Sequence, residues 1–400
     1  MAQGASSARV PVNLQRRAFW VALSVIVVLG LLLRLWAARQ WSWFQDDWRY
    51  LELTQDMGFA DYVLQNYNGH LMPLQFVLTW VITAVAPLQY GYALVVSLLL
   101  MAASAVTWAV LLVRIFGRRP QVLLGLVLLL FTPTLFPATL WWASSLQTYG
   151  LQWGMGATLL VLTGYLSRGG AWRLAGVVGV YLAALGLWEK SLLIAIPAGF
   201  LLFFLPGIDR RDAFIRRRIL LAAVAIAALS SVYVVGYLVA TAAPVPGQAT
   251  LGIPGVDALV GFGLGAGMGI LLPGFLGAPW SGIDNLQSTF PLVPAWLQFL
   301  SAALALAVAT ASVVVRRRAW APLAMALVYV LVMWAIVVGS SRFSSLGQFA
   351  SLDTRYSADA VPVLVFALVF CITSTRLEGA DAWFAPPSAM PARSLRVVVG

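Results

Sequence analysis

The chain has 400 residues, of which 61% are hydrophobic and only 10% are charged, and its formal net charge is +11. Soluble globular proteins carry about 45–50% apolar and about 25% charged residues. This composition therefore excludes a soluble enzyme, as well as disordered, collagen-like and disulfide-rich secreted proteins. Repeated apolar runs of about 20 residues, the length that spans a bilayer, instead predict an all-α, polytopic transmembrane protein.

The positive charge is concentrated in short arginine clusters between the apolar runs, at positions 16–17, 118–119, 210–211, 216–218 and 316–318. Such clusters are typical of cytoplasmic loops. They lack the interleaved aromatic residues that stack on bases, so we expect no nucleic-acid partner. Cys371, the only cysteine, lies inside an apolar run. We expect it to be a small core residue without a disulfide.

In chain order, residues 1–17 are expected to form a cytoplasmic N-terminus, followed by an uncleaved first span. Residues 38–70 form a predominantly acidic loop, which should lie outside the membrane. Because the arginine clusters should all lie on the cytoplasmic side, the chain must cross the membrane an even number of times between any two of them. The runs predicted to cross, about ten in number, are 18–33, 92–113, 121–140, 148–167, 172–188, 191–206, 219–241, 296–315, 319–339 and 360–375.

Two further apolar runs, 71–88 and 258–279, would break this alternation if they crossed, so we expect them to be interfacial or re-entrant helices. The transmembrane domain as a whole is expected over residues 18–376, with its catalytic first outer loop at 38–70. Residues 377–400 are rich in Pro and Ala and are expected to form a loosely ordered tail. The last residues, L-R-V-V-V-G, resemble the start of another span, which suggests a truncated chain.

The first outer loop contains two adjacent carboxylates, Asp46 and Asp47, flanked by tryptophans. One of them could cap a helix over 48–57 that ends near Gly58, but capping does not require both. Adjacent carboxylates repel each other when both are ionised, so they favour a cation, a shared proton or a basic partner. We therefore interpret the pair as a candidate general base, and Asp47 as a candidate ligand of a divalent cation, Mg²⁺ or Mn²⁺. The tryptophans should hold this loop at headgroup depth, where a lipid-linked substrate presents its phosphate.

His70, the only histidine, closes the same loop. A single histidine is commonly a hydrogen-bonded structural residue, but an imidazole beside an acidic pair is also suited to a metal or a phosphate. Glu189 precedes Lys190, the only lysine, between two apolar runs. They could form an ion pair at the membrane boundary, or Lys190 could bind a phosphate while Glu189 orients it or the acceptor.

The predicted outer loop before the last span contains Arg342, Arg355 and Tyr356. Arginines on the outer side oppose the usual charge bias, and an anionic substrate would explain them because guanidinium groups match phosphate oxygens. The alternative is a salt-bridged loop in which Arg355 pairs with Asp353 or Asp359.

Two other motifs have mainly structural interpretations. Glycines at positions 261, 265 and 269 share one helix face and lack the strand and lysine of a nucleotide-binding loop, which favours close helix packing. The aromatic segment 141–150 is typical of an interfacial belt. As an alternative, Trp142 and Gln147 could line a sugar pocket.

The N-terminal part of the chain resembles the GT-C superfamily of multi-span glycosyltransferases, which use polyprenyl-phosphate-linked sugars. The resemblance covers residues 18–120 and rests on a basic N-terminus, one span, Asp46-Asp47 opening a long outer loop, and H-L-M-P from His70 closing it. It implies a GT-C-like fold in which an aspartate deprotonates an acceptor hydroxyl at the outer membrane face. The basic residues then expected to neutralise the lipid phosphate are Lys190, Arg342 and Arg355.

The chain lacks the H-P-P form of some members, the W-W-D motif of oligosaccharyltransferases and an outer soluble domain. These departures favour a glycan or lipid acceptor over a protein. The arginine-rich composition suggests a bacterial cell membrane. A transporter or flippase for a lipid-linked or anionic solute is the main alternative, although such a protein needs charged residues along its spans, and these spans are nearly charge-free. A third hypothesis is a non-catalytic assembly subunit that has kept the fold.

Overall fold

The computed structural model describes residues 12–242, 254–278, 292–316 and 318–373. Within these ranges every regular element is a helix, apart from an isolated β-bridge between Tyr67 and His70. The prediction of an all-helical protein is therefore confirmed for the described residues. The predicted C-terminal tail, 377–400, lies outside them.

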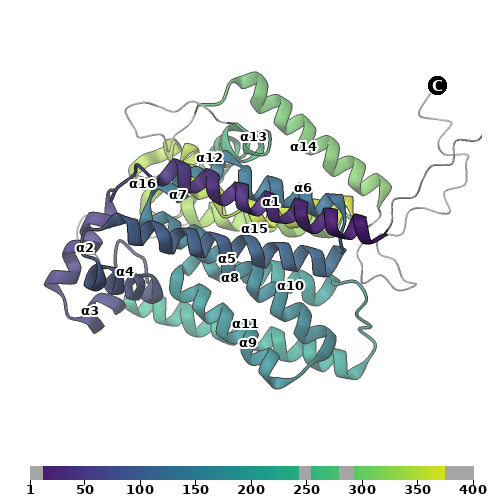
Figure 1. Ribbon diagram of the computed structural model, residues 1–400, viewed down its shortest axis with the longest axis horizontal. Coiled ribbons are helices and arrows are strands. Elements are labelled where there is room, and N and C mark those ends of the chain that lie inside the picture. The colour runs from purple at the N-terminus through teal and green to yellow at the C-terminus, as the bar shows by residue number, and fades with distance from the viewer. Residues whose placement is uncertain (1–11, 243–253, 279–291, 317, 374–400) are drawn as a thin grey trace, which may run out of the picture.

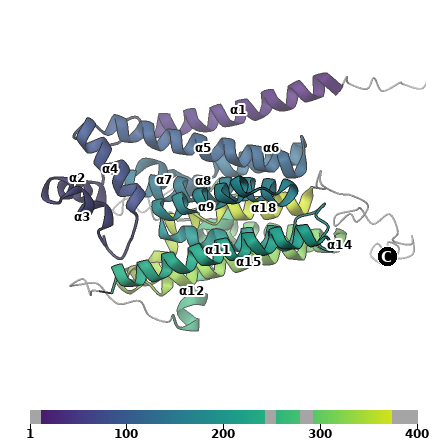
Figure 2. The ribbon, with the colours of Figure 1, turned by 90° about the horizontal axis from the view of Figure 1, so that it is seen from below.

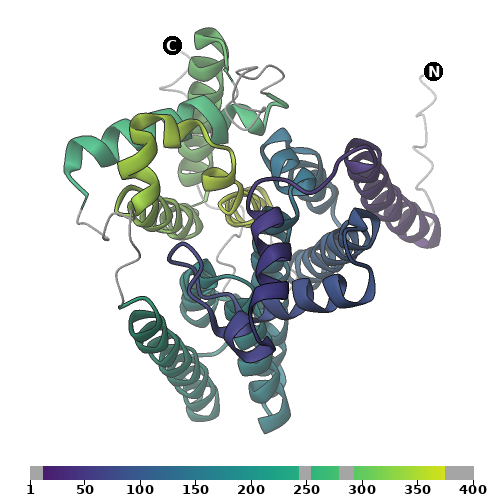
Figure 3. The ribbon, with the colours of Figure 1, turned by 90° about the vertical axis from the view of Figure 1, so that its left-hand side faces the viewer.

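Most long helices run along a common axis (Figure 1, Figure 2). These helices are α1 (Val12–Ala38), α5 (Tyr90–Phe116), α6 (Pro120–Phe131), α8 (Trp142–Arg168), α9 (Ala171–Leu187), α10 (Ala195–Phe204), α11 (Ala213–Ala240), α14 (Ala295–Val315), α15 (Trp320–Val338) and α18 (Val361–Ile372). Short helices gather at one end of this bundle, at the left of Figure 1 and facing the viewer in Figure 3. They are α2 (Asp46–Asp56), α3 (Phe59–Leu64), α4 (Pro73–Val85) and α16 (Ser341–Leu346).

Seven helices of the described part are long and apolar enough to cross a membrane, judged by length and composition. An eighth candidate is the pair formed by α6 and the following Pro133–Leu140 segment, which is bent by 43°. Pro133 explains the bend, because it has no N–H to donate and keeps the preceding Thr132 out of helical geometry. The structure thus agrees with a polytopic membrane protein, while the number of crossings, about ten, stays a prediction.

The two runs that we expected not to cross differ in their geometry. Helix α4 has 13 residues and is about 20 Å long, too short for a hydrocarbon layer of about 30 Å. Helix α12 (Val256–Ala266), with the π-helical turn Gly267–Leu271 and α13 (Leu272–Gly274), is long and apolar enough to cross. However, α12 runs across the bundle axis and not along it (Figure 2), and its interfacial or re-entrant placement stays a prediction.

The glycines of α12 let it pack closely on the 3₁₀ segment η5 (Gly347–Leu352). A Cβ atom at Gly265 would lie 2.2 Å from Oγ of Ser351, and one at Gly261 would lie 2.7 Å from Nε2 of Gln348. The contact at Gly265 leaves no room for a Cβ atom, whereas the flexible end of Gln348 could move away from one at Gly261 and the nearest atom to one at Gly269, Cδ2 of Leu352, would lie at an ordinary 3.5 Å. The prediction that these glycines serve close packing is therefore confirmed at Gly265.

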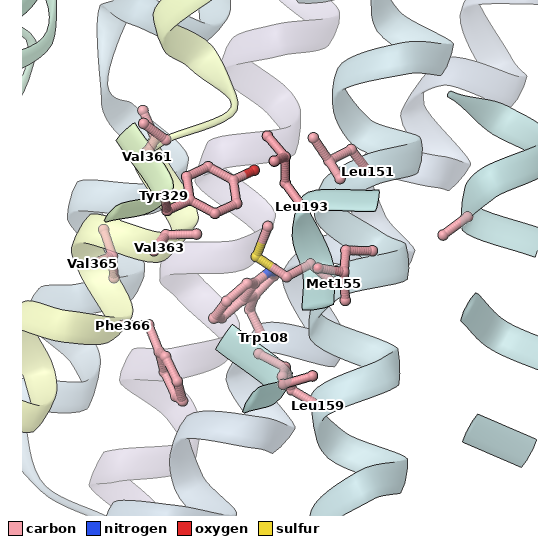
Figure 4. Close-up of a cluster of buried hydrophobic side chains, with 14 of the residues drawn as sticks. Trp108, Leu151, Met155, Leu159, Leu193, Tyr329, Val361, Val363, Val365 and Phe366 are labelled. Atoms are coloured by element: carbon pink, nitrogen blue, oxygen red, sulfur yellow. The ribbon is translucent and has the colours of Figure 1, made fainter. Parts of the chain in front are cut away.

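Helix α8 is the centre of the bundle and is buried along most of its length. Its Met155 and Leu159 pack with Trp108 of α5 and Phe366 of α18 in the core (Figure 4). Cys371 of α18 is also buried and forms no disulfide, as predicted. Helix α8 contacts α5, α9 and α10. Residues at its two ends therefore contact residues at the two opposite ends of the bundle.

Candidate functional site

Asp47 belongs to α2, and its side chain contacts the N-terminus of α8. Its side chain is fully buried, with Oδ1 accepting a hydrogen bond from Ala143 N at 2.9 Å and Oδ2 accepting one from Phe44 N at 3.0 Å. The prediction that an aspartate caps its own helix is wrong, because α2 begins at Asp46 after Gln45 and has no side-chain cap. Asp47 instead binds the free N–H groups that begin α8, which every helix start exposes.

Burial raises the pKa of Asp47 to about 7, although the backbone N–H groups of Ala143, Phe44 and Trp142 lower it, and the charge of Asp46 adds to the increase. A divalent cation requires ionised oxygens with free lone pairs. Both Asp47 oxygens already accept N–H groups, so this donor set does not fit Mg²⁺ or Mn²⁺. Over the ranges that the structure describes, no group of three His, Cys, Asp or Glu side chains could hold a metal ion.

Asp46 is half-buried and is the more accessible carboxylate of the pair. Its Oδ1 accepts a hydrogen bond from the Tyr67 hydroxyl at 3.1 Å. Burial raises the pKa of Tyr67, and the charge of Asp46 raises it further, so the phenol stays protonated and remains a donor. Asp46 also lies close enough to Arg355 and Tyr356 for its charge to act on both. The first outer loop and the segment before α18 therefore meet here.

His70 connects three segments of the chain. Its Nδ1 lies 2.6 Å from Oε1 of Glu189, and its Nε2 lies 3.5 Å from Nη2 of Arg342. A guanidinium can only donate, so the contact with Arg342 favours the arrangement in which Nε2 accepts and Nδ1 donates to Glu189.

The loop around His70 is anchored by tyrosines that the sequence analysis did not identify. Tyr237 and Tyr233 of α11 donate to the carbonyl oxygens of Gly69 and Leu71 at 2.7 and 2.6 Å. Their spacing of four residues, which places them on one helix face, was the available signal. Asn68 and Gly69 both have positive φ and form the tight turn that Tyr67 and His70 close.

Glu189 and Lys190 begin the 3₁₀ segment η2 (Glu189–Ile194) but do not pair with each other. Glu189 binds His70, whereas Nζ of Lys190 donates to Oδ2 of buried Asp359 at 3.4 Å and lies 4.4 Å from the Trp188 ring. The alternative of a local ion pair is therefore wrong, since consecutive residues of a helix point in different directions.

Arg355 forms a bidentate salt bridge with Asp353, with Nε 3.0 Å from each carboxylate oxygen. Its guanidinium also lies 4.3 Å from the Trp141 ring. The salt-bridged alternative is thus the one that forms, and Asp353 is the partner. Tyr356 lies within 5.5 Å of Lys190. Among the described residues, Arg342 forms no ion pair with a carboxylate.

The aromatic segment at the start of α8 is not a lipid-facing belt. Trp141 and Trp142 are buried, and Trp142 donates from Nε1 to Thr79 at 3.2 Å. Gln147 is half-buried and contacts Sδ of Met72, two residues after His70. These side chains therefore fix α8 against α4 and the first outer loop. The prediction of an interfacial belt is wrong, because packing partners replace the headgroups that it assumed.

Most of the predicted site residues thus converge through contacts between distant segments of the chain. These segments include α2 and α16, at the end of the bundle that faces the viewer in Figure 3. Asp353 and Asp359 each pair with one cation, whereas none of the ion pairs among the described residues joins Arg342 to a carboxylate. Comparison of the chain with protein-family models, with curated proteins and with solved structures found no match.

Proposed function

We propose that the protein is an integral membrane glycosyltransferase that moves a sugar from a polyprenyl-phosphate donor to the hydroxyl of a glycan or lipid acceptor. The observation that carries this proposal is the convergence of Asp46, His70, Glu189, Lys190 and Arg342 at one end of a bundle whose spans are nearly charge-free. A surface-facing catalyst needs its ionisable groups collected at one membrane face. A conduit needs them along the spans.

Asp46 is the base in this proposal, because it is more accessible than Asp47 and has only one described hydrogen-bond donor, Tyr67. It accepts the proton of the acceptor hydroxyl while the acceptor oxygen forms a bond to the anomeric carbon. The bond from that carbon to the phosphate oxygen breaks, and the lipid phosphate leaves with the electron pair. General-base catalysis of this kind contributes about 10²–10⁴-fold.

Arg342 neutralises the leaving phosphate in this scheme. Its only described hydrogen-bond partner is Nε2 of His70, at 3.5 Å, so a phosphate competes with a long contact to a ring nitrogen and not with a carboxylate. Glu189 orients His70, and His70 in turn positions Arg342. Asp47 has a positioning role: it fixes the start of α8 against the loop that carries Asp46.

The face of the membrane follows from the arginine clusters. The residues Arg114, Arg168, Arg173 and Arg218 lie around the end of α8 opposite to Asp47. Because arginine-rich loops are retained in the cytoplasm, the site with Asp46 is extracytoplasmic in this proposal. The protein then acts at the outer face of the cell membrane.

The test is transfer of radiolabelled sugar from polyprenyl-phosphate sugar to acceptor by the purified full-length chain in detergent. We expect Asp46→Asn to reduce turnover by about 10²–10⁴-fold, and Asp56→Asn, which changes an exposed carboxylate of the same helix, to leave it unchanged. Wild-type turnover by Asp46→Asn would remove the assigned base. Absence of transfer by the wild-type chain, together with movement of a lipid-linked solute across liposomes, would establish a flippase.

A further inference from the structure

The C-terminal end of α8 is surrounded by arginines from four helices. Arg168 ends α8 itself, and Arg114 of α5, Arg173 of α9 and Arg218 of α11 reach the same turn. With 27 residues, α8 is about 40 Å long, so this cluster lies a full membrane thickness from Asp47. We name these four residues the α8-end arginine cluster.

Two of these guanidinium groups, those of Arg114 and Arg218, lie against the last turns of α8. A Cβ atom at Gly164 would lie 3.5 Å from Nη2 of Arg114, and one at Gly169 would lie 2.7 Å from Nε of Arg218. The distance at Gly169 is shorter than real Cβ contacts, so glycine lets Arg218 approach the helix there, whereas the distance at Gly164 is an ordinary contact that places the Arg114 guanidinium against the same helix. Arg218 donates to the carbonyl oxygen of Leu166 at 3.0 Å, which fixes its position. Arg173 donates to the carbonyl oxygen of Gly169 at 2.8 Å.

The cluster has an uncompensated positive charge. Arg114 lies close enough to Arg168 and Arg173 for their charges to repel its own. None of the ion pairs among the described residues joins a member of the cluster to a carboxylate. The two aspartates just before α11 accept local hydrogen bonds, Asp209 from Arg211 N and Asp212 from Phe214 N in the first turn of α11. A bound anion would relieve the repulsion among the guanidinium groups.

Exposed aromatic residues place the cluster at the depth of lipid headgroups. Trp172 is 70% exposed and lies 4.4 Å from the guanidinium of Arg173, and Phe214, near the start of α11, is 74% exposed. Aromatic side chains of this kind are typical of the membrane interface. Basic pockets between transmembrane helices bind the phosphates of anionic lipids, which guanidinium groups match with two hydrogen bonds.

We propose that the α8-end arginine cluster binds the phosphodiester headgroup of an anionic phospholipid in the leaflet opposite to the Asp46 site. This inference does not depend on the proposed glycosyl transfer. The bound headgroup neutralises the cluster and joins the ends of α5, α8, α9 and α11, because its oxygens contact arginines from all four helices.

The test uses the full-length chain in nanodiscs of phosphatidylcholine mixed with phosphatidylglycerol, followed by native mass spectrometry after partial delipidation. We expect the wild-type chain to retain phosphatidylglycerol in preference to phosphatidylcholine. Retention should fall about fivefold for each of Arg114→Gln and Arg168→Gln, neither of which breaks a described hydrogen bond. Arg17→Gln removes an exposed arginine near the N-terminus of α1 and should leave retention unchanged.

A second measurement distinguishes lipid from free phosphate. The unfolding midpoint of the wild-type chain should rise when phosphatidylglycerol is added to phosphatidylcholine nanodiscs, and the rise should be lost in Arg114→Gln. Equal retention by wild type and both cluster variants would overturn the proposal. It would also be overturned if inorganic phosphate in pure phosphatidylcholine produced the same rise and phosphatidylglycerol added nothing. Equal unfolding midpoints in phosphatidylcholine alone would show that the variants are folded.

Discussion

The imidazole Nδ1 of His70 lies 2.6 Å from Oε1 of Glu189, although 119 residues separate them in the chain. This contact joins the first outer loop to η2 and leaves Nε2 of the same ring facing Arg342. The orientation of the phosphate-binding cation proposed above therefore depends on a carboxylate that never touches it.

Glu189→Gln tests this dependence. The amide keeps the shape of the carboxylate but is a weaker acceptor, and hydrogen bonds to charged groups contribute about 1.5–3 kcal/mol. We expect turnover in sugar transfer to fall about 10-fold or more, while the unfolding midpoint falls by no more than the weakening of this one hydrogen bond explains. Glu52→Gln is the matched control, since Glu52 is an exposed carboxylate of the same outer loop that pairs with Arg49. Equal turnover in Glu189→Gln and wild type would show that His70 needs no orienting partner.

Lys190 and Asp359 form a buried ion pair, and this pair should contribute to the stability of the protein. Removing one partner of a buried pair leaves an uncompensated charge and costs about 3–5 kcal/mol. We expect Lys190→Met to lower the unfolding midpoint strongly, and the double variant Lys190→Met/Asp359→Asn to recover most of the loss. Arg49→Met, which breaks an exposed pair, should have a much smaller effect. A double variant as unstable as the sum of the two single variants would show that the residues act independently.

Asp47 should make stability depend on pH. Its pKa in the folded protein is about 7, whereas an unfolded aspartate titrates near 4. Between these values the folded state binds the proton more tightly, so the contribution of Asp47 to stability is full below about pH 4 and is lost as pH rises through about 7. We expect the unfolding midpoint of the wild type to fall more between pH 5 and pH 8 than that of Asp47→Asn. Parallel pH profiles for the two proteins would contradict the raised pKa.

The same residue shows where sequence reasoning reached its limit at the site. The pattern at 46–47 indicated that one aspartate could cap a helix, and one does. The capped helix is α8, whose Ala143 N–H binds Asp47 from 96 residues away in the chain, and no local spacing encodes that. The same reasoning selected Glu189 and Lys190 as candidate site residues, with an ion pair between them as one alternative. It could not identify His70 and Asp359 as their partners, because these contacts depend on how α4, η2 and α17 (Arg355–Ala358) pack.

The fold was predicted to the extent that hydrophobic length determines it. Apolar runs located both ends of α5, α14 and α15 and the C-terminal end of α11 closely, since a span needs about 20 apolar residues regardless of its neighbours. Helix α1 extends beyond its predicted run, 18–33, at both ends, and α11 begins before its run, 219–241. The central helix α8 was harder to interpret because its polar residues and tryptophans resemble an interfacial segment. They are buried by α4, α5 and α9, and burial by neighbouring helices is a tertiary property that composition does not report.

The packing of α12 on η5 gives the last prediction, and it separates a steric requirement for glycine from a simple preference. A Cβ atom at Gly265 would lie 2.2 Å from Oγ and 2.8 Å from Cβ of Ser351, whereas nothing lies within 4 Å of a Cβ at Gly236 in α11. In a helix interior, alanine is more favourable than glycine by about 0.5–1 kcal/mol. Gly236→Ala should therefore leave the unfolding midpoint unchanged or raise it, while Gly265→Ala should lower it because α12 must move away from η5. If the contact with Ser351 is the cause, Ser351→Gly should restore most of the midpoint lost in Gly265→Ala. A Gly265→Ala midpoint equal to that of Gly236→Ala would mean that α12 can shift without cost, and the close packing would then have no role in stability.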